Sequence, residues 1–143
     1  MMRTETEVRG CLKRMLANGP LTALPKSPGD LDVFLALAAS RFEARRPYSE
    51  SAVNEILERW LATFCAPFGV DHVTVRRCLV DSHLLTRDKA GSAYEVAPDR
   101  LSQSIEDTAR GLEPAAVMSE LRNARESRKR RAQADGGTIG GER

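Results

Sequence analysis

The sequence predicts a small, mainly α-helical protein with a winged helix-turn-helix core, a short β-hairpin as the wing, and flanking N- and C-terminal helices. Its 143 residues, 41% of them hydrophobic, are enough for one domain with a modest core. Apolar residues recur at three- and four-residue spacing through most of the chain, but the pattern shortens to two strand-like runs around residues 88–91. The resulting order is helix, short strand, helix, helix and hairpin, which is the order of a winged helix.

The first unit, residues 1–28, is predicted to be one helix followed by a proline-rich linker. Val8, Leu12, Met15 and Leu16 lie at three- and four-residue spacings within residues 4–18. Asn18, Gly19 and Pro20 form a stop signal, because proline lacks an amide donor and restricts the residue before it. A helix over residues 4–18 is therefore expected, with a loop up to residue 28.

Two helices are predicted to open the core unit, residues 29–97. Asp30 is expected to cap a helix that runs to about Ala44 with one buried face. Tyr48 and Ser49 form a brief extended piece, and Ser49 caps a second helix that ends at about Phe64. The apolar residues expected to face inward are Val33, Phe34, Leu37, Ala38 and Phe42 in the first helix and Val53, Ile56, Leu57, Trp60 and Leu61 in the second.

A third helix and a hairpin are predicted to complete the core unit. Asp71 caps the helix at residues 72–82, which turns Val75, Cys78 and Leu79 inward. The strands are expected at residues 84–87 and 93–96, and Gly91 between them suits a positive φ angle.

The C-terminal third, residues 98–134, is predicted to form a weaker helix over residues 99–110 and a last helix from Pro114 to about Ala134. The final segment, residues 135–143, has four glycines and few residues to bury, so disorder is expected there. The first and last helices have narrow apolar stripes. They are therefore expected either to pack together on the core or to form a homodimer interface.

Charge is distributed unevenly along the chain. Residues 121–143 contain seven Lys and Arg against three acidic residues, a net charge of +4, whereas residues 1–120 have a net charge of −2. The longest apolar run, Val33–Ala39, is too short to span a bilayer, and residues 1–5 do not resemble a secretory signal. Three widely spaced cysteines argue against a disulfide scaffold. A cytoplasmic protein without a membrane partner is expected.

The third helix and the hairpin are the predicted DNA-binding surface. A recognition helix needs a polar, partly basic outer face for the major groove, while its other face packs on the core. Arginine reaches phosphates and guanine edges, and the wing supplies further backbone contacts. Double-stranded DNA is thus the expected partner, and the residues predicted to contact it are His72, Thr74, Arg76, Arg77, Arg87 and Lys89.

Two further surfaces are open to interpretation. Residues 30–97 contain eight basic and ten acidic residues, so a winged helix that docks on a larger protein through Val73 and Val80 is the alternative. The basic run near the C-terminus suits non-specific phosphate contact, or only compensation of the helix dipole and solubility. The residues of this nucleic-acid tail are Arg125, Arg128, Lys129, Arg130 and Arg131, preceded by Arg122.

Enzymatic and metal-dependent functions are not expected. Cys65, His72, Cys78 and His83 are separated by 7, 6 and 5 positions, which matches no common zinc spacing. The sequence has no glycine-rich phosphate loop and none of the common hydrolase or zinc-protease motifs. A Cys–His nucleophile pair would also need an orienting partner and an oxyanion hole, which nothing suggests. We expect no cofactor, no metal and no catalytic residues.

Several strings between residues 31 and 97 resemble a known bacterial family. They are Tyr48-Ser49-Glu50 with Val53-Asn54-Glu55, Asp71-His72 with Arg76-Arg77, and Leu84-Leu85 with Arg87 and Tyr94. Together they resemble domain-of-unknown-function family 2087. The resemblance implies a winged-helix-like fold, often fused behind the DNA-binding domain of a transcriptional regulator. No second regulator domain fits in residues 1–28, so a stand-alone form is expected.

The junction after the third helix has a second resemblance. Arg76-Arg77, Leu79-Val80, Leu84-Leu85 and Arg87-Asp88 resemble the passage from recognition helix to wing in MarR-type regulators. His83 stands at the helix-ending position, where those proteins have glycine. A positive φ angle is therefore expected at His83.

Overall fold

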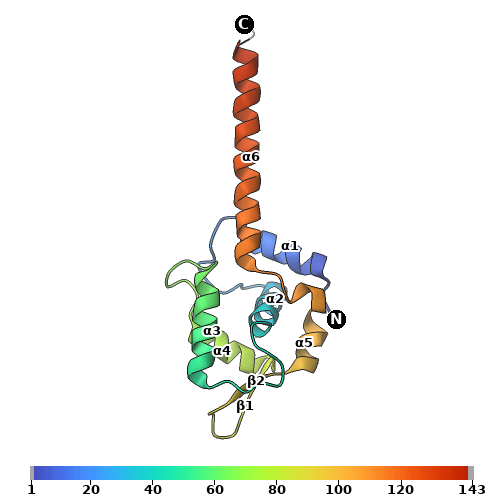
Figure 1. The fold of residues 1–143 in the computed structure, drawn as a ribbon, viewed down its shortest axis with the longest axis vertical. Helices are drawn as coiled ribbons and strands as arrows, with labels where there is room; N and C mark the ends of the chain where they lie inside the picture. The colour runs from blue at the N-terminus through green and yellow to red at the C-terminus, as the bar shows by residue number, and fades with distance from the viewer. Residues whose placement is uncertain (1, 142–143) are drawn as a thin grey trace.

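The computed structural model describes residues 2–141, with side chains as far as residue 134. The fold is mainly helical with one small antiparallel hairpin, as predicted (Figure 1). A central helix is surrounded by the others, and the last helix extends away from the body. The elements in chain order are α1 (Glu5–Met15), α2 (Pro28–Ala39), α3 (Glu50–Ala62), α4 (His72–Asp81), β1 (Leu85–Arg87), β2 (Tyr94–Val96), α5 (Pro98–Ser104), the 3₁₀ helix η1 (Asp107–Ala109) and α6 (Pro114–Gly141).

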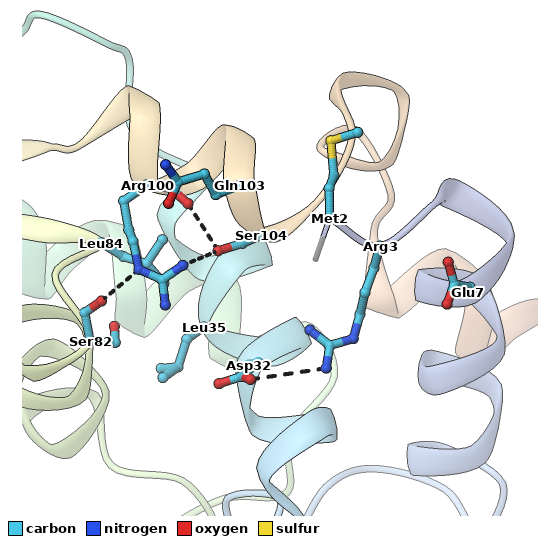
Figure 2. A pocket seen from close by; sticks show the side chains of 10 residues that line it. All are labelled: Met2, Arg3, Glu7, Asp32, Leu35, Ser82, Leu84, Arg100, Gln103 and Ser104. Carbon is cyan, nitrogen blue, oxygen red and sulfur yellow. Dashed lines mark hydrogen bonds and ion pairs between the residues drawn. The ribbon is translucent and has the colours of Figure 1, made fainter.

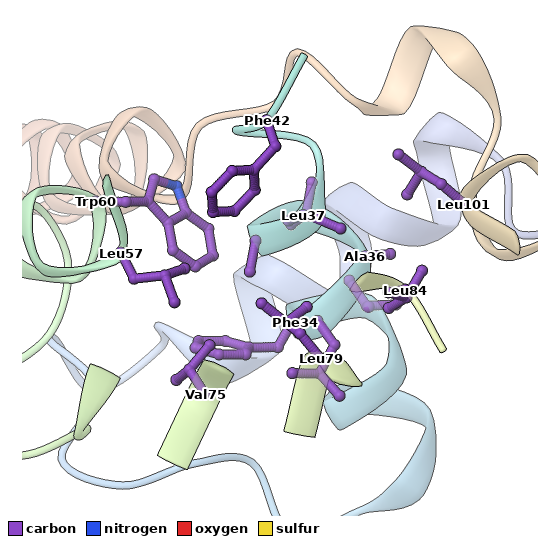
Figure 3. Close-up of a cluster of buried hydrophobic side chains, with 14 of the residues drawn as sticks. Phe34, Ala36, Leu37, Phe42, Leu57, Trp60, Val75, Leu79, Leu84 and Leu101 are labelled. Atoms are coloured by element: carbon purple, nitrogen blue, oxygen red, sulfur yellow. The ribbon is translucent and has the colours of Figure 1, made fainter. Parts of the chain in front are cut away.

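From Val33 onward the central helix α2 is buried on all sides. Every residue from Val33 to Ala39 is buried, whereas the sequence predicted one buried face. The reason is its position, because α1, α4 and α5 all pack against it. Phe34 also reaches the aromatic side chains of α3, with ring centroids 5.5 Å from Trp60 (Figure 3). This single core supports α3 and α4, which bear the predicted site.

Two of the predicted helix caps are confirmed and one is wrong. Ser49 accepts a hydrogen bond from the Ala52 amide, and Asp71 accepts one from the Thr74 amide. Helix α2, however, is capped by Ser27 and not by Asp30. The reason is that Pro28 suits the first helical position, so the helix starts earlier in the chain than predicted. Asp30 instead pairs with Arg14 of α1, at 2.5 Å.

The end of α2 also differs from the prediction. The helix stops at Ala39 and not near Ala44, and the Ser40 hydroxyl donates to the Ala36 carbonyl at this end. The chain then turns through Arg45, whose φ angle of 63° is incompatible with a continuing helix. Tyr48 follows as the predicted extended piece.

Tyr48 adds a third segment to the hairpin. The register of β1 and β2 pairs Leu85 with Val96 and Arg87 with Tyr94. Tyr48 and Tyr94 then exchange two backbone hydrogen bonds of 2.8 Å, which joins the chain before α3 to β2. Gly91 has the predicted positive φ, 72°. The hairpin is therefore tied to the start of α3 as well as to α4.

The segment after the hairpin is more broken than predicted. In place of one helix over residues 99–110, α5 ends at Ser104, Ile105 is extended, and the 3₁₀ helix η1 follows. The cause is a short parallel bridge to the N-terminus: the Arg3 amide donates to the Ser104 carbonyl, and the Glu106 amide donates to the Arg3 carbonyl. A continuous helix could not make these bonds.

The last helix begins at Pro114 as predicted but continues to Gly141, beyond the expected end near Ala134. The tail predicted to be disordered, residues 135–143, thus overlaps helix over residues 135–141, and residues 142–143 lie outside the described part.

Of the two arrangements expected for the terminal helices, the structure has the intramolecular one. Helices α1 and α6 pack together, with Val8, Leu12 and Val117 buried. Arg9 and Glu120 add an ion pair of 3.5 Å across this contact. The apolar stripes of the terminal helices are therefore covered within one chain. Among the described residues, no helix is both long and apolar enough to cross a membrane.

Candidate nucleic-acid interface

The start of α4 is fixed by its cap. The Asp71 carboxylate accepts hydrogen bonds from the Thr74 amide, at 3.3 Å, and from the Thr74 hydroxyl, at 3.1 Å. Desolvation alone would raise the pKa of Asp71, but the hydrogen bonds donated by Thr74 outweigh it and lower the pKa. Thr74 is exposed as predicted, yet its hydroxyl already donates within the cap. The first turn is thus held in place before any partner binds.

His72 and Arg76 turn toward α3 and not toward solvent. The His72 Nε2 atom lies 3.3 Å from the Glu58 carboxylate. One nitrogen of the Arg76 guanidinium donates to the Asn54 side-chain oxygen at 2.5 Å, and another lies 3.4 Å from the Glu50 carboxylate. Only 14% of the Arg76 side chain is exposed. Two of the six residues predicted to contact DNA are therefore engaged within the protein.

The Arg76 contacts belong to a network that joins three elements. The Tyr94 hydroxyl in β2 donates to the same Glu50 carboxylate oxygen, at 3.3 Å. Glu50 and Asn54 in α3 thereby hold Arg76 in α4 and Tyr94 in the hairpin. Sequence reasoning did not identify Glu50, Asn54 or Tyr94 as parts of the site. The available signal was the four-residue spacing of Glu50 and Asn54, which places both on one face of α3.

Three predicted arginines meet at one cavity. A concave site of about 230 Å³ lies between α4 and the hairpin and is lined by Arg76, Arg77 and Arg87. Val80, Asp81 and Tyr94 complete its wall. Arg77 and Arg87 are exposed, and within the described residues neither has a carboxylate within ion-pair distance. The structure therefore brings Arg87 of β1 beside the cavity that Arg76 and Arg77 of α4 also line, although it lies at least ten positions after them in the sequence.

The hairpin loop is held by Asp88. Its carboxylate accepts hydrogen bonds from the Ser92 hydroxyl, at 2.8 Å, and from the amides of Ser92 and Ala93. The Ser92 hydroxyl is the main reason that the pKa of Asp88 lies below its ordinary value. Lys89 is exposed at the tip of this loop and does not line the three-arginine cavity. It is available to a partner that extends past the hairpin.

The turn between α4 and β1 has the predicted backbone conformation. His83 has a φ angle of 65°, and its amide donates to the Val80 carbonyl. The Leu84 amide donates to the Leu79 carbonyl, so α4 ends in a tight closing turn. The direction in which the hairpin leaves α4 follows from this turn.

The basic run of α6 lies at the opposite end of the molecule from the hairpin (Figure 1). All six basic residues of this run are exposed: Arg122, Arg125, Arg128, Lys129, Arg130 and Arg131. The two regions predicted to bind nucleic acid are therefore separate surfaces.

The cysteines have the properties of structural side chains. Burial raises the pKa of the Cys65 thiol to about 11, and desolvation, followed by the charge of Asp81, raises the pKa of Cys78. At neutral pH both are therefore thiols and poor nucleophiles. Within the described residues, no group of three His, Cys, Asp or Glu side chains is placed to hold a metal ion.

The described chain is thus a small helical domain in which two helices and a hairpin are locked together by a polar network. Residues 20–96 match the model of the family described as an uncharacterized protein conserved in bacteria, DUF2087, and the chain belongs to this family. This range includes the whole three-arginine cavity and the network around Glu50. No curated protein and no solved structure matches the chain.

Proposed function

We propose that this protein is a DNA-associated regulator of the winged-helix type, which contacts duplex DNA through α4 and the hairpin. The observation that carries the proposal is the cavity lined by Arg76, Arg77 and Arg87. Arg77 and Arg87, on two sides of this concave surface, supply the charge and the N–H donors that a backbone phosphate needs. The role is one of binding, with no catalytic step.

The arrangement of elements supports the same proposal. Helix α2, the Tyr48 bridge, α3, α4 and the hairpin follow one another in winged-helix order. The 10 residues of α4 form a helix about 15 Å long, which fits the major groove. Its exposed or half-exposed positions include Val73, Thr74 and Arg77. Val73 and Thr74 lie near its N-terminus, the part of a recognition helix that contacts base edges.

The arginines have different roles in this proposal. Arg76 is a positioning residue, because Glu50 and Asn54 already occupy its guanidinium. Arg77 and Arg87 are the phosphate contacts, since both are exposed and come from the two sides of the cavity. Lys89 adds a contact from the tip of the hairpin. The cations of α6 bind phosphates without sequence preference and, by their position, do so independently.

The test uses a background in which α6 is neutralised, because otherwise its cations would hide the second surface. In this background Arg128, Lys129, Arg130 and Arg131 are all replaced by glutamine. Adding Arg77→Gln and Arg87→Gln is expected to weaken binding to a 30-base-pair duplex at least about tenfold. It also reduces the slope of log K against log salt by about 1.8, because each phosphate contact contributes about 0.9. Fluorescence anisotropy across a salt series measures both.

The matched control removes two charges away from the cavity. Arg59→Gln with Lys13→Gln changes two exposed cations of α3 and α1 and is expected to leave affinity and slope nearly unchanged. Equal losses in the two double variants would mean that net charge and not the cavity determines binding. The proposal would then be wrong.

A protein-docking role is the second candidate, and the loop between α3 and α4 favours it. Phe68 is fully exposed with a φ of 61°, beside a groove of about 640 Å³ lined by Leu61, Cys65 and Val70. Exposed Glu58 and Asp71 also line the groove, which suits a partner segment with an apolar anchor and basic flanks.

This candidate has its own test. Phe68→Ser is expected to abolish binding of a lysine-flanked leucine peptide with the thermal midpoint unchanged, whereas Phe68→Tyr retains binding. Binding that survives Phe68→Ser would exclude this groove as the docking site. Val73→Glu tests the α4 surface first predicted for docking in the same assay.

A further inference from the structure

A second cavity shares no lining residue with the three-arginine cavity. It has a volume of about 410 Å³ and lies between the N-terminal residues, the middle of α2, α5 and the turn from α4 to β1 (Figure 2). Its volume is within the range of small-molecule sites. Arg3 and Arg100 enter it from two sides, with Leu35 and Asp32 between them.

Arg100 is held rigidly in this cavity by neutral partners. Its Nε atom donates to the Ser82 carbonyl at 3.2 Å, and its Nη1 atom donates to the Ser104 hydroxyl at 3.0 Å. Ser104 is the one buried polar residue among those described, and its hydroxyl donates in turn to the Arg100 carbonyl. Of the five guanidinium N–H groups, these bonds use two. One N–H of Nη1 and both of Nη2 are left free to donate.

Arg100 differs from the other partly buried arginines in lacking a counter-ion. Among the described residues, Arg3, Arg9, Arg41, Arg76 and Arg110 are also partly buried, and each has a carboxylate within 4.0 Å. No described carboxylate lies that close to Arg100. Asp32 across the cavity is paired with Arg3, at 4.0 Å. Removing a cation partly from water costs free energy, and a bound anion would offset that cost.

We propose that this cavity is a binding site for a small organic carboxylate, held by the free fork of Arg100. A planar carboxylate matches the two remaining N–H directions of the guanidinium in a bidentate pair. Leu35 and Leu84, both nearly fully buried, form an apolar wall for the hydrocarbon part of the ligand. Inorganic phosphate has no hydrocarbon part and would gain nothing from this wall.

The test follows backbone amide shifts of the ¹⁵N-labelled full chain during titration with sodium benzoate at constant ionic strength. Benzoate is expected to shift the amides of Ser82, Leu84 and Ser104 saturably, with a millimolar dissociation constant typical of a fragment-sized ligand. Benzamide, which has the same ring and no charge, and inorganic phosphate leave them in place. Equal shifts with benzamide or phosphate would overturn the assignment of a carboxylate site.

Two variants locate the contact. Arg100→Gln is expected to weaken benzoate binding at least about tenfold, because it removes a charge-assisted pair. Gln103→Glu is a second variant, chosen because Arg100→Gln could also impair folding. Gln103 is an exposed residue of α5 that lines the cavity. Its replacement by glutamate places an anion beside Arg100 that competes with benzoate. Gln133→Glu makes the same change on α6 and retains full binding. If Gln103→Glu binds benzoate as well as Gln133→Glu does, the proposed carboxylate site is wrong. This outcome is independent of whether the protein binds DNA.

Discussion

The α4–hairpin face and the α6 arm both carry exposed arginines, but they differ in net charge and in how those arginines are placed. Residues 71–96 contain four basic and four acidic residues, so this face has no excess charge and depends on placement. Residues 122–131 contain six basic residues against Glu126 alone. On the first surface, tertiary contacts bring Arg77 and Arg87 to one cavity, whereas on the second the cations are distributed along a projecting helix.

The two surfaces differ in what their charged side chains can do. An arm with many exposed cations is expected to attract any phosphate backbone, and salt screens such attraction strongly. A cavity with arginines from two elements can hold one phosphate in a defined place, because Glu50 and Asn54 orient Arg76 beside it. Four changes would test or sharpen this contrast, beginning with the largest expected effect.

Neutralising the arm is expected to have the largest effect on non-specific binding. Replacing Arg128, Lys129, Arg130 and Arg131 with glutamine, a residue of similar helix propensity, keeps the helix but removes four cations. The salt slope for random duplex DNA is expected to fall by about 3.6, at about 0.9 per phosphate contact. Anisotropy titrations between low and moderate salt measure it. An unchanged slope would show that α6 does not contact phosphates.

Breaking the network around Arg76 is expected to affect the fold and not only binding. Arg76→Met is predicted to lower the free energy of unfolding by about 2 kcal/mol, because it removes hydrogen bonds to a charged group and leaves Glu50 with one fewer partner. Arg125→Met on the arm serves as the matched control and stays within about 0.5 kcal/mol. Urea unfolding monitored by circular dichroism distinguishes them, and equal stabilities would contradict a positioning role.

Changing Gly91 to alanine tests whether the hairpin backbone places Arg87. Alanine at a φ of 72° costs about 1 kcal/mol, and a Cβ atom here would lie 3.3 Å from the Arg87 Nε atom. The Arg87 side chain is therefore expected to move out of the cavity and weaken duplex binding in the α6-neutralised background. Gly111→Ala, where a Cβ atom has open space, is the control.

The smallest expected effect concerns acid stability. The folded protein holds the pKa of Asp88 below its ordinary value, so ionised Asp88 stabilises the fold above about pH 4. This contribution is lost as the pH falls through the lowered pKa. Asp88→Asn is therefore expected to flatten the acid limb of a stability profile measured by urea unfolding from pH 7 to pH 3. An identical limb in wild type and variant would contradict it.

Local patterns predicted most of the elements, because caps, stop signals and turn glycines act over a few residues. Ser49, Asp71, His83 and Gly91 all have the predicted roles. The errors occur where distant segments intervene. Ser104 and Glu106 bond to Arg3 from the other end of the chain, which breaks the helix predicted over residues 99–110.

The site was predictable in its residue types but not in their partners. Sequence spacing placed Arg76 and Arg77 on one helix, yet both were assigned to the outer face. That Arg76 turns inward depends on Glu50 and Asn54, 26 and 22 positions away, which only the packing of α3 on α4 brings within reach. The Arg100 cavity had no local signal, because its walls come from four separate segments.

The sequence by itself determined where most of the helices and the hairpin begin, and where charge accumulates, since these depend on residues that are neighbours along the chain. The tertiary structure alone decided which arginines are exposed and which are paired, and that α2 is buried on every side. Such properties depend on contacts between distant segments, whose geometry is set by packing around one shared core.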